Sequence, residues 1–198
     1  MWLFAVVGLC AGAAIGWART RALKAAAPAV GAILGGLGGA AAAWSGYRPA
    51  WVLMVVMLLW LWIGFVDFAE QRIPDVLSGA AAGTAAVGLL GAAGVTGEWA
   101  RFGQAAAIAA LIAAAAAVWS IFGTLGWGDV KLSASIGLML GWQGWQATGV
   151  GIGAGILTAG IWAGIVAARR RSWHGHFPLA PSWLLGIFGV IVATHPGL

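Results

Sequence analysis

Apolar segments of about 20 residues follow one another along almost the whole chain of 198 residues, and short stretches between them hold most of the charges. An α-helix of that length and composition can cross the hydrocarbon core of a bilayer. Only 8% of the residues are charged, whereas soluble domains carry roughly 25%. The Ala-rich runs lack the alternation typical of membrane strands. The sequence therefore predicts an all-α polytopic membrane protein, embedded in the lipid bilayer as a single domain over residues 1–198.

Cutting the chain at charges, prolines and Gly-rich turns gives eight candidate spans. They are residues 2–18, 27–45, 50–67, 76–95, 104–122, 130–147, 148–168 and 179–195. The cut between the sixth and seventh rests only on Trp142–Gln146. If the N-terminus lies outside, every Lys and Arg except Arg48 and Arg101 falls on the cytoplasmic side, as the positive-inside rule requires. We therefore expect eight transmembrane helices with the N-terminus outside.

Tryptophans and small residues fit this picture. Eight tryptophans lie near predicted helix ends, where indole suits the membrane interface: Trp17, Trp44, Trp51, Trp99, Trp127, Trp142, Trp145 and Trp183. Small-residue pairs at four-residue spacing let helix backbones approach closely. They occur at Gly31/Gly35/Gly39, Gly79/Gly83, Gly137/Gly141, Gly151/Gly155 and Gly160/Gly164. We expect these glycines to pack helices within the molecule.

Composition also excludes several kinds of site. The net charge is +5, but the basic residues are scattered and form no face with stacking aromatics, which argues against a nucleic-acid partner. Cys10 is the single cysteine, so the chain can form no internal disulfide and no cysteine-based zinc cluster. We expect no metal site.

Two rare acids, Asp67 and Asp129, lie at the edges of apolar runs in a chain with only five acidic residues. The predicted topology places both near the cytoplasmic interface, Asp67 at the end of the third span and Asp129 at the start of the sixth. Two close carboxylates cannot both ionise cheaply, so such a pair shares a proton and can activate a water. Each acid alone has a structural explanation: Asp129 and Asp75 suit the first turn of a helix, and Asp67 suits a solvated position beside the membrane.

The residues around these acids resemble two signatures of the type IV prepilin peptidases. Residues 66–77 read VDFAEQRIPDVL, similar to the first signature, in which an Asp and a short polar stretch precede Ile-Pro-Asp or Ile-Pro-Asn. Residues 126–137 read GWGDVKLSASIG, similar to the second, Gly-x-Gly-Asp-x-Lys-Leu before a small-residue helix. Residues 177–181 read FPLAP, a looser match to a Pro-rich stretch before the last helix.

The resemblance implies a GxGD-type aspartic endopeptidase in the bacterial inner membrane. Asp67 and Asp129 would be the catalytic pair, and Gly126 and Gly128 would permit the backbone bend that aims Asp129. Its substrates would be prepilins and pseudopilins of type IV pili and type II secretion. The family cuts the short basic leader of these substrates on the cytoplasmic side, just before an apolar helix.

Other motif residues have assignments of their own. Pro74 and Asp75 complete the first signature, and Glu70 and Asp75 could attract the basic leader or simply be solvated with Arg72. Lys131 could tune Asp129 or snorkel to lipid headgroups, and we favour the second. The cysteine-containing cytoplasmic region of the long family form is missing here. No cofactor is therefore expected, since S-adenosylmethionine would be needed only if N-methylation of the new terminus were retained.

Two further functions stay open at this stage. Acids in membrane segments often mark ion or proton paths, so a transporter or channel is one alternative. A GxGD protease that acts on other membrane substrates is the second, because sequence does not identify the substrate. Loss of cleavage on replacing either aspartate would favour a protease, and ion flux that requires Asp67 would favour a transporter.

Overall fold

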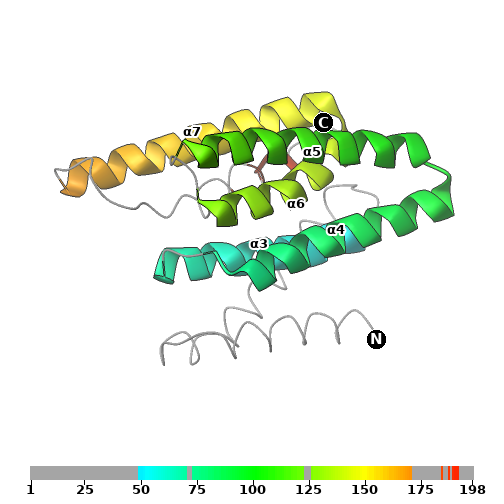
Figure 1. Ribbon diagram of the computed structural model, residues 1–198, viewed down its shortest axis with the longest axis horizontal. Coiled ribbons are helices and arrows are strands. Elements are labelled where there is room, and N and C mark those ends of the chain that lie inside the picture. The colour runs from blue at the N-terminus through cyan, green and yellow to red at the C-terminus, as the bar shows by residue number, and fades with distance from the viewer. Residues whose placement is uncertain are drawn as a thin grey trace.

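The computed structural model describes residues 49–70, 73–122, 126–170, 184, 187 and 189–191. This part of the chain is helical and contains no strand, which confirms the all-α prediction. Its long helices are α3 (Ala50–Glu70), α4 (Asp75–Thr96), α5 (Trp99–Ile121), α6 (Trp127–Gln143) and α7 (Trp145–Arg170) (Figure 1). They correspond in order to the third to seventh predicted spans.

Four of these helices, α3, α4, α5 and α7, are long and apolar enough to cross a membrane. They indicate a membrane protein. The fifth, α6, has only 17 residues, fewer than the about 20 that a typical span needs. The predicted spans 2–18 and 27–45, most of 179–195 and the N-terminal orientation lie outside the described residues. The count of eight and the single domain over 1–198 therefore remain predictions.

Helix α6 lies at the centre of the described bundle, in contact with α5, α4 and α7 (Figure 1). From Leu132 to Trp142 every residue except Ala134 is buried. A helix that is apolar and buried on all sides belongs to the core of a protein. The element that begins with the Gly-x-Gly-Asp motif is thus enclosed by its neighbours.

A close backbone contact joins α6 to α5 through glycines. A Cβ on Gly137 would lie 2.5 Å from Ala109 Cα, and one on Gly141 would lie 2.8 Å from Ala105 Cα. The backbones can approach this closely only because both α6 residues lack a side chain. The predicted packing role is confirmed for this pair.

The packing role is wrong for two other predicted pairs, Gly79/Gly83 and Gly160/Gly164. A Cβ added at any of these four glycines would meet no atom within 4 Å. The spacing is the same as that of Gly137/Gly141, but none of the described helices crosses at these positions. The predicted group Gly31/Gly35/Gly39 lies outside the described residues.

A buried hydrogen bond joins α3 to α6. Trp60 Nε1 donates to Ser135 Oγ at 2.8 Å, and Ser135 Oγ donates in turn to the Leu132 carbonyl at 2.8 Å. Both polar side chains are satisfied inside an apolar core, where an unmade bond would cost about 1–3 kcal/mol. Trp60 therefore holds two helices together.

Trp142 departs from the predicted anchoring role. Its side chain is 2% exposed, and the Arg101 guanidinium lies 5.6 Å from its ring centre. Trp51, Trp99, Trp127 and Trp145 are exposed near helix ends, as interfacial anchors are. Trp142 differs because its helix, α6, is surrounded by protein.

The chain breaks between α6 and α7 at Gly144, whose φ is 115°. L side chains rarely adopt this conformation, so glycine ends the helix here. The predicted helix boundary within Trp142–Gln146 is therefore confirmed, but its exact position was wrong. Helix α6 ends at Gln143 rather than at residue 147. Helix α5 begins at Trp99 rather than at residue 104, and Glu98 and Arg101 form an ion pair of 3.0 Å across its first turn.

We predict that Gly137→Ala destabilises the protein by about 1–3 kcal/mol, because the new methyl group would overlap the α5 backbone. Gly83→Ala is the matched control, since its Cβ meets open space and alanine favours the helix by roughly 0.5–1 kcal/mol. Thermal unfolding in detergent measures both. Equal midpoints for the two variants would contradict the close α5–α6 contact.

Candidate functional site

The two motif segments meet where α6 begins, beside the turn between α3 and α4. A Cβ on Gly128 would lie 2.7 Å from Ile73 Cβ and 3.4 Å from the Ile73 carbonyl oxygen. Ile73 therefore occupies the space that a side chain at Gly128 would need. The start of α6 can reach the Ile-Pro-Asp segment because position 128 is glycine.

An ion pair spans the same junction. Lys131 Nζ lies 2.8 Å from Asp75 Oδ1. Lys131 therefore has a protein carboxylate within reach, and the expectation that it snorkels to lipid headgroups stays a prediction. Both side chains are about half exposed or more, 47% for Lys131 and 72% for Asp75. Such an exposed pair contributes only about 0.2–1 kcal/mol, so it stabilises the junction only weakly.

Asp129 is the third residue of α6, after Gly126 at the N-cap. The Gly126 backbone N–H donates a hydrogen bond to the Asp129 carboxylate. This is one half of a capping box, in which an acid at the third helical position satisfies the N-cap N–H. The predicted first-turn role of Asp129 is therefore confirmed. It fixes the carboxylate over the start of the helix.

The predicted reason for the two motif glycines is wrong. Gly126 has φ −74° and ψ 149°, an extended conformation that any residue adopts and that N-cap residues commonly have. Gly128 lies within the helix. Neither glycine supplies an unusual bend. Both glycines leave space that a side chain would fill. Gly128 makes room for Ile73, and a Cβ on Gly126 would lie 3.3 Å from Asp129 Oδ2.

Asp67 and Asp129 influence each other across the junction. Asp67 lies in the last part of α3 and is 7% exposed. Asp129 lies in α6, outside the four helices that could span a membrane. Burial raises the pKa of Asp129 from the ordinary 3.8 to about 6, with a further raising effect from the Asp67 charge and a lowering effect from the Gly126 hydrogen bond. The structure thus brings the two predicted acids into one electrostatic site.

The other motif residues take structural positions around this site. Pro74 is the N-cap of α4 and Asp75 its first residue, where a negative charge suits the helix dipole. The Pro74 carbonyl accepts hydrogen bonds from the backbone N–H groups of Leu77 and Ser78, each 3.1 Å. Glu70 ends α3, but its side chain lies outside the described part, as does Arg72.

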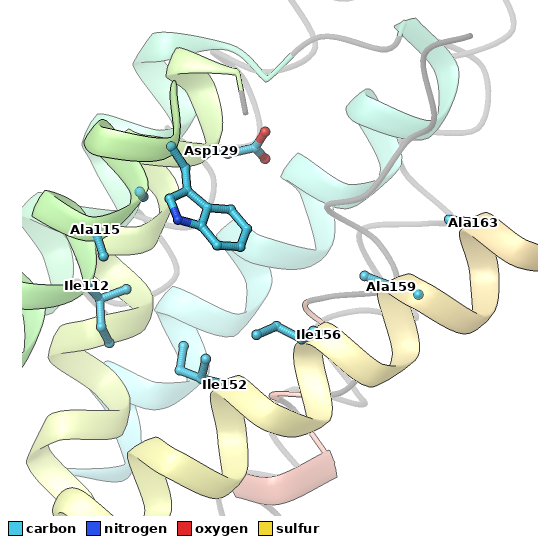
Figure 2. A pocket seen from close by; sticks show the side chains of 10 residues that line it. Ile112, Ala115, Asp129, Ile152, Ile156, Ala159 and Ala163 are labelled. Atoms are coloured by element: carbon cyan, nitrogen blue, oxygen red, sulfur yellow. The ribbon is translucent and has the colours of Figure 1, made fainter. Parts of the chain in front are cut away.

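An apolar pocket of about 470 Å³ opens beside Asp129 between α5 and α7. Figure 2 shows Ile112 and Ala115 on one side, Ile152, Ile156, Ala159 and Ala163 on the other, and Asp129 at one end. Asp129 is the only charged residue among the described residues that line this pocket. Its carboxyl therefore stands where a polar site meets a large apolar surface.

This arrangement suits general acid–base chemistry. One buried carboxyl with a raised pKa and a second acid nearby can hold a single proton between them and exchange it with a substrate. Among the described residues, no three His, Cys, Asp or Glu side chains are grouped in a way that could hold a metal ion.

Two sets of residues at this site were not predicted from the sequence. Ile73 was part of the first signature but had no assigned role, although the two glycines of the second signature hinted that something must approach them. The α7 residues that line the pocket were hidden in an Ala/Gly-rich helix. Their signal was the Gly160/Gly164 pair, which we had attributed to packing.

We predict that reversing one charge of the Lys131–Asp75 pair lowers the unfolding midpoint slightly, and that reversing both restores it. Lys131→Asp replaces attraction by repulsion, a change of about 1 kcal/mol or less at this exposure. Adding Asp75→Lys recreates the pair in the opposite sense. If the double variant is as unstable as the sum of the single variants, the two residues do not interact.

Comparison with known proteins supports this assembly of motifs. The model of the type IV leader peptidase family matches residues 52–194, which include both signatures, α3 from its third residue and all of α4 to α7. Comparisons with curated proteins and with solved structures yield no match. Because the family model covers most of the chain, the chain belongs to the type IV leader peptidase family, whose members are peptidases and therefore hydrolases.

Proposed function

We propose that this protein is an aspartic endopeptidase in which Asp67 and Asp129 are the catalytic residues. One observation carries the proposal: burial raises the pKa of Asp129, from the second signature, and the charge of Asp67, from the first, raises it further. Acids 62 positions apart in the sequence thus act on one another in a chain of a peptidase family.

The proposed reaction uses one proton shared by the two acids. The ionised carboxylate takes a proton from water, whose oxygen then bonds to the scissile carbonyl carbon. The protonated carboxyl donates its proton to the carbonyl oxygen. Collapse of the tetrahedral intermediate breaks the C–N bond, and the amine leaves with a proton from the pair. A pKa of about 6 at Asp129 supports this reaction, because it keeps a proton available closer to neutral pH than an ordinary aspartic acid would.

The proposed substrates are prepilins and pseudopilins, cut between their basic leader and apolar helix at the cytoplasmic face of a bacterial inner membrane. The acidic residues gathered at one end of the described bundle support this choice, because Asp67, Asp75 and Asp129 would attract a basic leader. Asp75 would bind a basic residue of the leader in place of its partner Lys131. No cofactor enters the reaction, and S-adenosylmethionine would be needed only for N-methylation.

We predict that Asp67→Asn and Asp129→Asn each abolish cleavage of a prepilin by the purified protein. An amide cannot take up or release the shared proton, and loss of a general acid or base typically lowers rates by about 10²–10⁴-fold. Mass analysis of the product's N-terminus measures cleavage, its position and any methylation together.

Glu98→Gln is the matched control. This substitution also removes one negative charge, but Glu98 lies between α4 and α5 and pairs with Arg101. Cleavage should therefore continue at the wild-type rate. Substantial cleavage by either folded aspartate variant would overturn the proposed catalytic pair. Thermal unfolding of each variant confirms that loss of activity is not loss of fold.

A further inference from the structure

Helix α7 leaves most of its apolar surface unused by the described bundle. Only 11% of its membrane-length span is buried, the lowest share among the four candidate spans. It packs mainly against α6, so α5 and α7 leave between them the pocket that ends at Asp129 (Figure 2). We call this space the α7 groove, defined by Ile112 and Ala115 on one side, Ile152, Ile156 and Ala163 on the other, and Asp129 at its end.

One wall of the α7 groove has the length of a short helical segment. From Ile152 to Ala163 the α7 wall rises about 17 Å, at about 1.5 Å per residue, which is roughly three helical turns. Small residues, Ala159, Gly160 and Ala163, form part of this wall, and a Cβ at Gly160 would meet no atom within 4 Å. Such a wall lets another helix approach closely.

We propose that the α7 groove binds the first turns of the substrate's apolar helix, immediately after the scissile bond. The inference rests on the proposed function and adds to it the surface that positions the substrate. The arrangement of polar and apolar parts in the two molecules supports it. The proposed substrate has a basic leader, then the scissile bond, then an apolar helix. The enzyme has exposed Asp75, which pairs with Lys131 two residues from Asp129, and it has Asp129 at the end of the apolar groove.

This order makes a peptide a better occupant than a lipid. An acyl chain that fills the groove would place hydrocarbon against the Asp129 carboxyl, which loses solvation without gaining a hydrogen bond. A substrate helix brings the polar scissile peptide bond to the same point. The apolar turns exclude water along the groove while the bond to be cut reaches the acid.

Two tryptophan variants of α7 test the α7 groove. Ile156 lines it and is 60% exposed, whereas Ile161 is 55% exposed on the same helix and does not line it. Ile156→Trp would fill the groove, and Ile161→Trp adds the same bulk on another face of α7. We expect Ile156→Trp to raise the KM for a prepilin on the order of tenfold, because it removes substrate binding, and Ile161→Trp to behave as wild type.

A cross-linking experiment reads out binding without cleavage. A benzophenone amino acid is placed at position 156 or 161 of the Asp129→Asn protein, which is reconstituted in vesicles with an intact prepilin. The inference requires a cross-link from position 156 to the first apolar turns of the prepilin, and little or none from position 161.

The outcomes separate the two proposals. If the wild-type protein leaves prepilin intact, the proposed function fails. If it cuts prepilin but the two tryptophan variants have equal KM, the inference about the α7 groove is overturned while the proposed function stands. Cross-links from position 156 to lipid alone would also overturn it, because they would show that acyl chains occupy the groove.

Discussion

The close approach of Gly128 to Ile73 determines where the two acid-bearing segments meet. Ile73 lies just before α4, Gly128 lies in the first turn of α6, and a Cβ between them would stand 2.7 Å from Ile73 Cβ. Any larger residue at position 128 would push the start of α6 away from the turn that follows α3. The rest of the site depends on this contact, because it sets Asp129 near Asp67 and brings Lys131 to Asp75. The close α5–α6 packing at Gly137 and Gly141 then holds α6 in place.

Burying an acid beside another acid works against stability, and the structure offsets that cost only in part. The Gly126 N–H stabilises the Asp129 carboxylate, but burial and the Asp67 charge outweigh it, so the pKa of Asp129 rises to about 6. A purely structural helix cap would gain by staying ionised, with a low pKa. The proposed proton transfer requires a raised pKa of this kind. The apolar groove beside Asp129 fits the proposed reaction as well. An apolar surface that ends at an acid suits a substrate with a polar bond at the edge of an apolar segment.

Much of the described fold could be predicted from the sequence, because apolar length and charge placement dominate in a membrane protein. The order of α3 to α7 follows from that pattern, and so does the break at Gly144. The position of α6 in the core could not be predicted, since a buried helix and a lipid-facing helix have similar composition. The same ambiguity caused the error at Trp142. The pairing of Asp67 with Asp129 was predicted from motif and depth, whereas the contacts of Gly128 and Lys131 depend on three-dimensional packing that spacing does not encode.

The central claim is that Asp67 and Asp129 form one electrostatic pair, and the titration of Asp129 in the presence and absence of its partner tests it most directly. The chain has three aspartates, so ¹³C-labelled aspartate gives a simple carboxyl spectrum by nuclear magnetic resonance. The account predicts a midpoint for Asp129 of about 6 in the wild-type protein and a lower midpoint in Asp67→Asn, because the neighbouring negative charge is gone. The same midpoint in both proteins would contradict the pairing.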